Sequence, residues 1–131
     1  MGFRVLFVLL VLGGSLPTQA HQLKSDGDVG ALLHIEPGDQ PQAGVPQQVW
    51  FNLVKRGGTK ITPGQCNCTL TLNQGPQRLS QTALSLVNKR PTARVTFPKQ
   101  GRYTLVLTGT AKTAALPFQP FILRWNVQVS R

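Results

Sequence analysis

The side chains that could perform acid–base chemistry or bind a metal are few, and they lie near the start of the chain. Both histidines, His21 and His34, and all four carboxylates precede Gln40 in a chain of 131 residues. A nucleophile–histidine–carboxylate arrangement would need a serine or cysteine from a distant segment, and no spacing motif indicates one. The sequence therefore predicts a protein that is not an enzyme and favours a binding function.

The start of the chain has the order that is typical of a secretory leader. Arg4 precedes the apolar run Val5–Leu12, and small residues follow as far as Ala20. The run is far shorter than the roughly 20 residues that a membrane-spanning helix needs. We therefore predict a signal peptide over residues 1–20, cleavage after Ala20, and a secreted or periplasmic protein.

Cleavage after Ala20 would leave His21 with both a free α-amino group and an imidazole. Together these nitrogens can chelate one Cu(II) ion, which prefers a tetragonal set of nitrogen ligands. His34 would add a second imidazole, and Asp26 or Asp28 would supply an oxygen. His34 has the outward phase of its predicted strand, so its ring should be reachable. The sequence otherwise predicts that the protein carries no cofactor, so copper is the alternative prediction.

The only two cysteines, Cys66 and Cys68, have three interpretations. They are two buried thiols that continue the core face of Leu70 and Leu72, a local disulfide, or a metal–thiolate site. An exported protein favours a disulfide. However, residues i and i+2 of a flat strand lie about 6.5–7 Å apart, which is the upper limit for a bridge, so a disulfide needs a bulge or a twist.

Positive charge dominates the rest of the chain. The formal net charge is +10, and twelve of the fourteen lysines and arginines follow Gln40, where there is no acid. Internal salt bridges cannot neutralise these groups, so they must face water or an anionic partner. The predicted strands and turns place a basic surface at Lys55, Arg56, Lys60, Arg94, Arg102 and Arg124.

This charge favours an anionic surface or an acidic protein as the partner, and peripheral association with a membrane fits it as well. Nucleic acid is disfavoured, because the chain is predicted to be exported and lacks the interleaved aromatic and basic residues of a stacking platform. The oligomeric state does not follow from the sequence.

Seven segments are candidate strands, and most of them alternate with the period of two that a half-buried strand requires. Residues 47–55 are apolar on both faces, as in a central strand, and the weakly apolar residues 79–86 form either an edge strand or a loose crossing. Turn-forming glycines and prolines separate the seven segments, and no helical periodicity is present. The sequence therefore predicts an all-β, immunoglobulin-like sandwich of two antiparallel sheets, with a barrel as the alternative. A flexible arm over residues 21–29 would precede the domain at 30–131. The predicted strands are 30–36, 47–55, 66–72, 79–86, 92–97, 101–108 and 121–129.

The clearest strand begins after the turn Pro98–Gly101 and carries Tyr103 at its entry. This is where immunoglobulin-like sandwiches place a tyrosine corner, in which the ring is buried and the hydroxyl bonds to nearby backbone. We expect Phe51, Val95, Tyr103, Leu105, Trp125 and Val127 to lie in the core.

Three stretches resemble the small exported immunoglobulin-like families of bacteria, the YtkA-like and CopC-like domains. They are the segment Pro46–Leu53, the turn and strand Phe97-Pro98-x-x-Gly101-x-Tyr103-x-Leu105, and the alternating final strand. The resemblance implies an immunoglobulin-like fold. It also implies a route to copper, because some CopC-like proteins bind copper through a mature N-terminal histidine. The methionine-rich tract that some of those proteins use for Cu(I) is missing here, since the only methionine is Met1.

Overall fold

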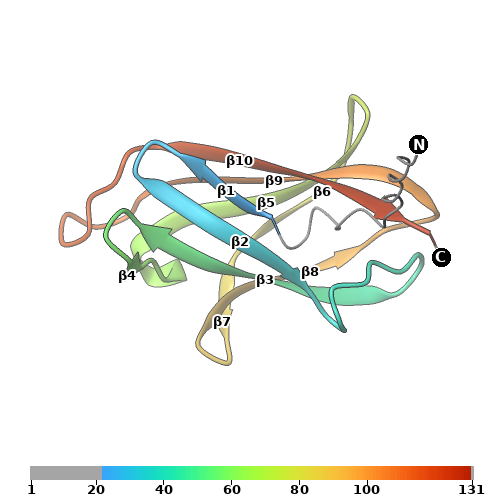
Figure 1. Ribbon diagram of the computed structural model, residues 1–131, viewed down its shortest axis with the longest axis horizontal. Helices are drawn as coiled ribbons and strands as arrows, with labels where there is room; N and C mark the ends of the chain where they lie inside the picture. Colours follow the sequence, from blue (N-terminus) through green and yellow to red (C-terminus); the bar gives the residue numbers. More distant parts are fainter. Residues whose placement is uncertain (1–21, 131) are drawn as a thin grey trace, which may run out of the picture.

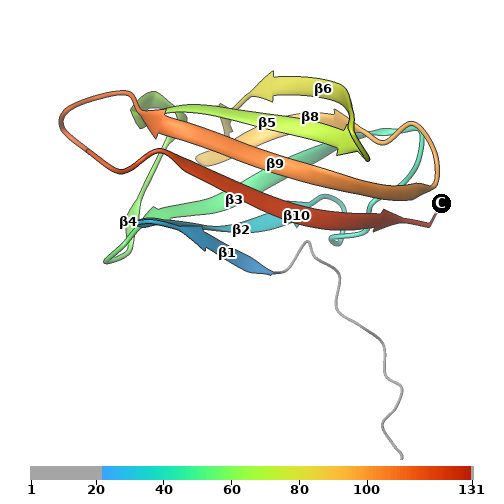
Figure 2. The same cartoon turned by 90° about the horizontal axis from the view of Figure 1, so that it is seen from above.

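The computed structural model describes residues 22–130, in which two antiparallel sheets lie face to face (Figures 1 and 2). The predicted signal peptide and His21 lie outside the described residues. The first sheet has the order β1 (Leu23–Asp26), β2 (Val29–Ile35), β3 (Pro46–Lys55), β8 (Arg90–Thr96) and β7 (Ser85–Val87), with β4 (Thr59–Lys60) paired to β3. The second has the order β10 (Phe121–Val129), β9 (Gly101–Ala111), β5 (Cys66–Gln74) and β6 (Gln77–Ala83).

The predicted two-sheet antiparallel sandwich is confirmed, with ten strands rather than about seven. The additional strands are short and lie at sheet edges: β1, β4, and β7, which separates from β6 within the predicted segment 79–86. A single turn of 3₁₀ helix, η3 (Pro63–Gln65), leads into β5. Within residues 22–130, no helix is long and apolar enough to cross a membrane.

The start of the domain differs from the predicted flexible arm, because Leu23–Asp26 form β1. This strand pairs with β2 from Leu23↔Leu32 to Asp26↔Val29. It is also attached to the opposite sheet, since the indole Nε1 of Trp125 donates a hydrogen bond of 2.8 Å to the carbonyl of Gln22. Leu23 is 69% exposed, so this edge strand lacks the hydrophobic alternation by which a strand is recognised in a sequence.

The core lies between the two sheets and is built by alternation. All six predicted core residues are buried, and along β10 every odd-numbered residue from Phe121 to Val129 faces inward. The rings of Phe51 and Trp125 meet across the sandwich, with centroids 5.5 Å apart. Burial of each large apolar side chain stabilises the fold by about 1.5–3 kcal/mol.

The predicted tyrosine corner is confirmed. The Tyr103 hydroxyl donates a hydrogen bond of 2.6 Å to the carbonyl of Lys99 and accepts one of 3.2 Å from the Lys99 amide. The ring is buried, and its centroid lies 5.2 Å from that of Phe97. These contacts fix the turn between β8 and β9, so that the chain passes from one sheet to the other as in immunoglobulin-like domains.

Candidate functional site

Cys66 and Cys68 are joined by a disulfide, so neither is a free thiol. Both side chains are buried on the inner face of β5, as the alternation with Leu70 and Leu72 predicts. Their Cα atoms are 5.2 Å apart, closer than residues i and i+2 of a flat strand. The interpretations as two thiols and as a metal–thiolate site are therefore wrong for this structure.

Gly109 makes room for this disulfide and was not singled out in the sequence. It pairs with Cys68, and a Cβ atom added to it would lie 2.8 Å from the Sγ atom of Cys66. The same Cβ would lie 2.6 Å from two ring carbons of Phe121. A glycine inside an otherwise regular strand was the available signal, since it marks a close approach of neighbouring groups.

His34 has the predicted outward orientation, opposite the buried Leu33 and Ile35. Its imidazole stacks on the indole of Trp50, with ring centroids 4.0 Å apart and an angle of 14° between the planes. This contact follows from the register, which pairs the two residues across β2 and β3. The side chain is 17% exposed, so only part of the ring meets solvent.

The carboxylate beside His34 belongs to Asp39, which the sequence did not indicate as a ligand. The Nδ1 atom of His34 lies 3.6 Å from Oδ1 of Asp39, and this Oδ1 also accepts a hydrogen bond of 2.9 Å from the Ile35 amide. The turn after β2 makes the contact by bringing Asp39 back toward the strand, with a left-handed φ of 57°. Asp39 tolerates this conformation because its side chain bonds locally to the backbone.

Asp26 and Asp28 do not lie beside His34, which corrects the expectation that one of them would supply an oxygen. They flank the turn between β1 and β2, and Asp26 pairs with Val29 at the opposite end of β2. The carboxylate of Asp26 accepts a hydrogen bond of 2.8 Å from the Ile122 amide, and that of Asp28 accepts one of 3.0 Å from the Gln119 amide. Both acids therefore attach the first sheet to β10 and the loop before it.

Trp50 is the centre of a polar cluster on the outer face of the first sheet. Its Nε1 atom donates a hydrogen bond of 2.8 Å to the Glu36 carboxylate. The guanidinium carbon of Arg90 lies 4.0 Å from the ring centroid, a cation–π contact from β8, while His34 approaches from β2. We call His34, Glu36, Asp39, Trp50 and Arg90 the Trp50 cluster.

The Trp50 cluster does not by itself form a metal site. Among residues 22–130, no group of three or more His, Cys, Asp and Glu side chains could hold a metal ion. His34 and Asp39 provide two donors, and the predicted ligand His21 lies outside the part of the chain that the structure describes.

The six predicted basic residues lie on the surface but do not form a single patch. Arg94 is on the outer face of the first sheet, whereas Arg102 and Arg124 are on the outer face of the second. The other three, Lys55, Arg56 and Lys60, crowd the β3–β4 turn at one end of the sandwich.

None of these cations is neutralised by a carboxylate within residues 22–130. There the only contact of salt-bridge length joins Nδ1 of His34 to Oδ1 of Asp39. Asp26 and Asp28 bond to backbone amides, Glu36 bonds to Trp50, and Asp39 bonds to the Ile35 amide beside His34. The side chains of Arg56 and Lys112 likewise reach only backbone carbonyls.

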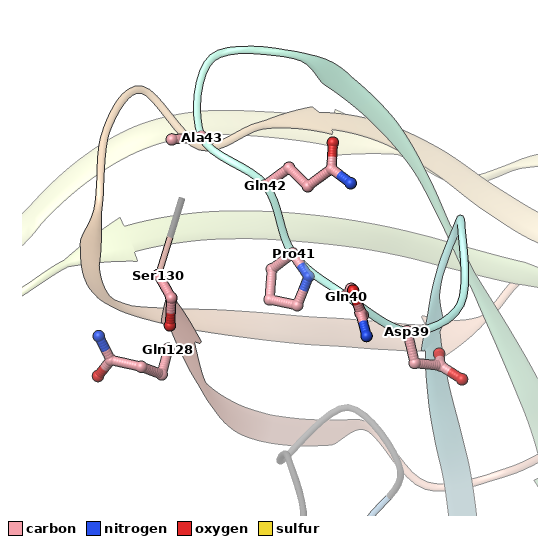
Figure 3. Close-up of a pocket in the computed structure, with 7 residues that line it drawn as sticks. All are labelled: Asp39, Gln40, Pro41, Gln42, Ala43, Gln128 and Ser130. Carbon is pink, nitrogen blue, oxygen red and sulfur yellow. The ribbon is translucent and has the colours of Figure 1, made fainter.

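A surface pocket of about 590 Å³ lies between the β2–β3 loop and the end of β10 (Figure 3). Its lining consists of Asp39, Gln40, Pro41, Gln42, Ala43, Gln128 and Ser130. The buried Gln47 fixes one wall, because its side-chain amide bonds to the carbonyls of Glu36 and Gln40 and to the amide of Gln42. Among the described residues of this lining, Asp39 is the only one with a titratable side chain.

Comparison of the chain with protein-family models, curated proteins and solved structures finds no match. The resemblance to YtkA-like and CopC-like domains therefore stays a prediction. An immunoglobulin-like sandwich carries many unrelated functions, so function has to be argued from the surface and the Trp50 cluster.

Proposed function

We propose that this protein is an exported, non-enzymatic binding module that uses unneutralised positive charge to hold an anionic partner. The observation that supports the proposal is that, within residues 22–130, no salt bridge joins a carboxylate to a lysine or arginine. Asp26, Asp28 and Glu36 bond instead to backbone amides or to Trp50. The buried disulfide is consistent with an oxidising compartment.

The charge is sufficient for such a role without a dedicated pocket. An exposed lysine or arginine contributes on the order of 1 kcal/mol near an anionic surface. About four of them acting together give millimolar binding and about eight give micromolar binding, and this binding weakens as added salt shortens the screening length. The pocket of Figure 3 has no lysine or arginine among its described lining residues and is not part of this proposal.

The test is sedimentation of the mature chain with phosphatidylglycerol vesicles and with polygalacturonate, beside phosphatidylcholine vesicles and dextran as neutral controls. We expect binding to at least one anionic probe at low salt, none to the neutral probes, and a steep loss at high salt. The proposal is wrong if no anionic probe binds at low salt, or if binding does not change with salt.

We propose copper binding as a second candidate function, because the β1–β2 register favours it. Leu23 pairs with Leu32, so the chain before Leu23 is directed toward His34, two positions further along β2. The predicted ligand His21 directly precedes Gln22 and lies outside the described residues. A processed N-terminus would then supply an amine and an imidazole next to the His34 imidazole and the Asp39 carboxylate, a nitrogen-rich set that suits Cu(II).

This candidate is tested by titrating Cu(II) into protein that begins at His21 and into protein with one glycine added before it. We expect one ion per chain in the first form and at least a tenfold weaker affinity in the second, because the extension removes the α-amine from the chelate. His34→Ala and Asp39→Asn should also weaken binding, whereas the matched variant Asp26→Asn should not. Equal affinity in the extended and authentic forms would exclude the site.

A further inference from the structure

The outer face of the second sheet has a composition unlike that of the first. Along β5 and β9 the outward positions are mostly threonine and asparagine, from Asn67 to Asn73 and from Thr104 to Thr110. No residue of β10, β9, β5 or β6 carries a carboxylate. Figure 2 shows these four strands as one continuous layer.

Three arginines lie on this outer face, and they are well separated from one another. The register places Asn126, Thr104, Asn73 and Arg78 in one row across the four strands. Arg124 lies in the next row on one side, and Arg102, which pairs with Gln128, lies in the next row on the other. With strands about 4.8 Å apart and same-face residues about 6.8 Å apart along a strand, the arginines are roughly 12–16 Å from one another.

The side chains between the arginines are already ordered by cross-strand hydrogen bonds. Thr104 donates to Asn126 over 3.2 Å, and Gln81 donates to Thr71 over 3.3 Å. Such bonds reduce the side-chain entropy that binding would otherwise cost. The hydroxyl and amide groups retain further capacity to donate and accept.

We infer that this face binds an acidic polysaccharide, an inference that rests on the proposed function and names its partner. Guanidinium groups bind carboxylates or sulfates in a bidentate manner, while threonine and asparagine side chains can bond to sugar hydroxyls. A protein partner fits less well, since protein interfaces depend on aromatic and apolar anchors. This face carries no aromatic side chain on its strands, and Ile122 is its only exposed large hydrophobic residue.

The experiment compares two triple variants of equal charge in the full mature chain. The face variant is R78S/R102S/R124S, and the matched control is K55S/K60S/R94S, which removes three charges from the first sheet. The probe is polygalacturonate, with dextran and phosphatidylglycerol vesicles beside it. Loss of three charge-assisted contacts should weaken polygalacturonate binding roughly 30- to 100-fold in the face variant, and about threefold in the control.

The possible outcomes distinguish the inferred polysaccharide-binding face from the proposed function. Equal weakening of polygalacturonate binding by both triple variants would show that this face is not the binding site, and the proposed function would still hold. Tighter binding to the vesicles than to the polysaccharide would contradict the inference of a polysaccharide partner, again without contradicting the proposed function. Failure of the unaltered protein to bind any anionic probe would overturn the proposed function itself. Thermal melting of both variants provides the folding control, because all three arginines of the face variant are exposed and their loss should leave the midpoint unchanged.

Discussion

Gly109 lies where the disulfide, β9 and β10 meet, and replacing it with alanine should destabilise the fold strongly. The new Cβ atom would lie 2.6 Å from Cε2 and Cζ of Phe121 and 2.8 Å from Sγ of Cys66. Both neighbours are buried, and the sulfur is tied to Cys68, so neither can move away freely. Overpacking of a well-packed core costs about 1–3 kcal/mol, and two simultaneous clashes place this substitution at the upper end, near 3 kcal/mol.

The measurement is urea unfolding followed by tryptophan fluorescence, with a thermal melt in parallel. A loss of about 3 kcal/mol in a domain of this size lowers the melting temperature by on the order of 10–20 °C. Gly30→Ala is the matched control, because Gly30 also lies inside a strand but the added Cβ would meet only ordinary contacts at 3.6 Å or more. That substitution should stabilise by about 0.5 kcal/mol, since it removes the entropic cost of a strand glycine.

A double-mutant cycle isolates the clash with the ring. Phe121→Leu removes the two ring carbons that the new methyl group meets, so Gly109→Ala should cost about 1–2 kcal/mol less in that background. The contact with Cys66 persists and accounts for the remainder. Similar small effects of the Gly109 and Gly30 substitutions, or strict additivity in the cycle, would refute the packing argument.

Three further substitutions test other parts of the fold. Tyr103→Phe removes both hydrogen bonds to Lys99 and should cost about 1–3 kcal/mol in urea unfolding, whereas an unchanged midpoint would deny the corner a stabilising role. Lys89→Gly should raise the melting temperature by a few degrees, because Lys89 holds a left-handed φ of 63°; a lower value would contradict this. Gln47→Leu leaves three backbone groups of the β2–β3 loop without partners. It should therefore speed amide hydrogen exchange across that loop, and unaltered exchange would argue against the role assigned to Gln47.

The sequence was informative wherever burial alternates along a strand. Tyr103, Trp125 and Val127 could be assigned to the core because each is flanked by polar neighbours that must face water. The edge strand β1 could not be found in this way, since both faces of an exposed strand carry polar or exposed residues. The position of β1 is set by its pairing with β2 and by a hydrogen bond to Trp125, and neither interaction produces a recognisable pattern in the local sequence.

The candidate site was only partly predictable for a related reason. The orientation of His34 follows from its phase in β2, which the sequence contains. Its neighbour Asp39 arrives through a turn with a left-handed residue, and that geometry depends on Gln47 holding the loop. The distance between Cys66 and Cys68 depends on a local contraction of β5 that no spacing rule describes.

The placement of the acids links the two proposed activities to the fold. Asp26 and Asp28 attach the β1–β2 turn to Ile122 and Gln119, and the Gln22 carbonyl attaches the start of β1 to Trp125. Both ends of β1 are therefore held by hydrogen bonds to β10. The strands of the second sheet contain no Asp or Glu, so their outward side chains carry no negative charge. Since His34 lies on the first sheet and the three arginines on the second, variants that test one activity should leave the other intact in the same chain.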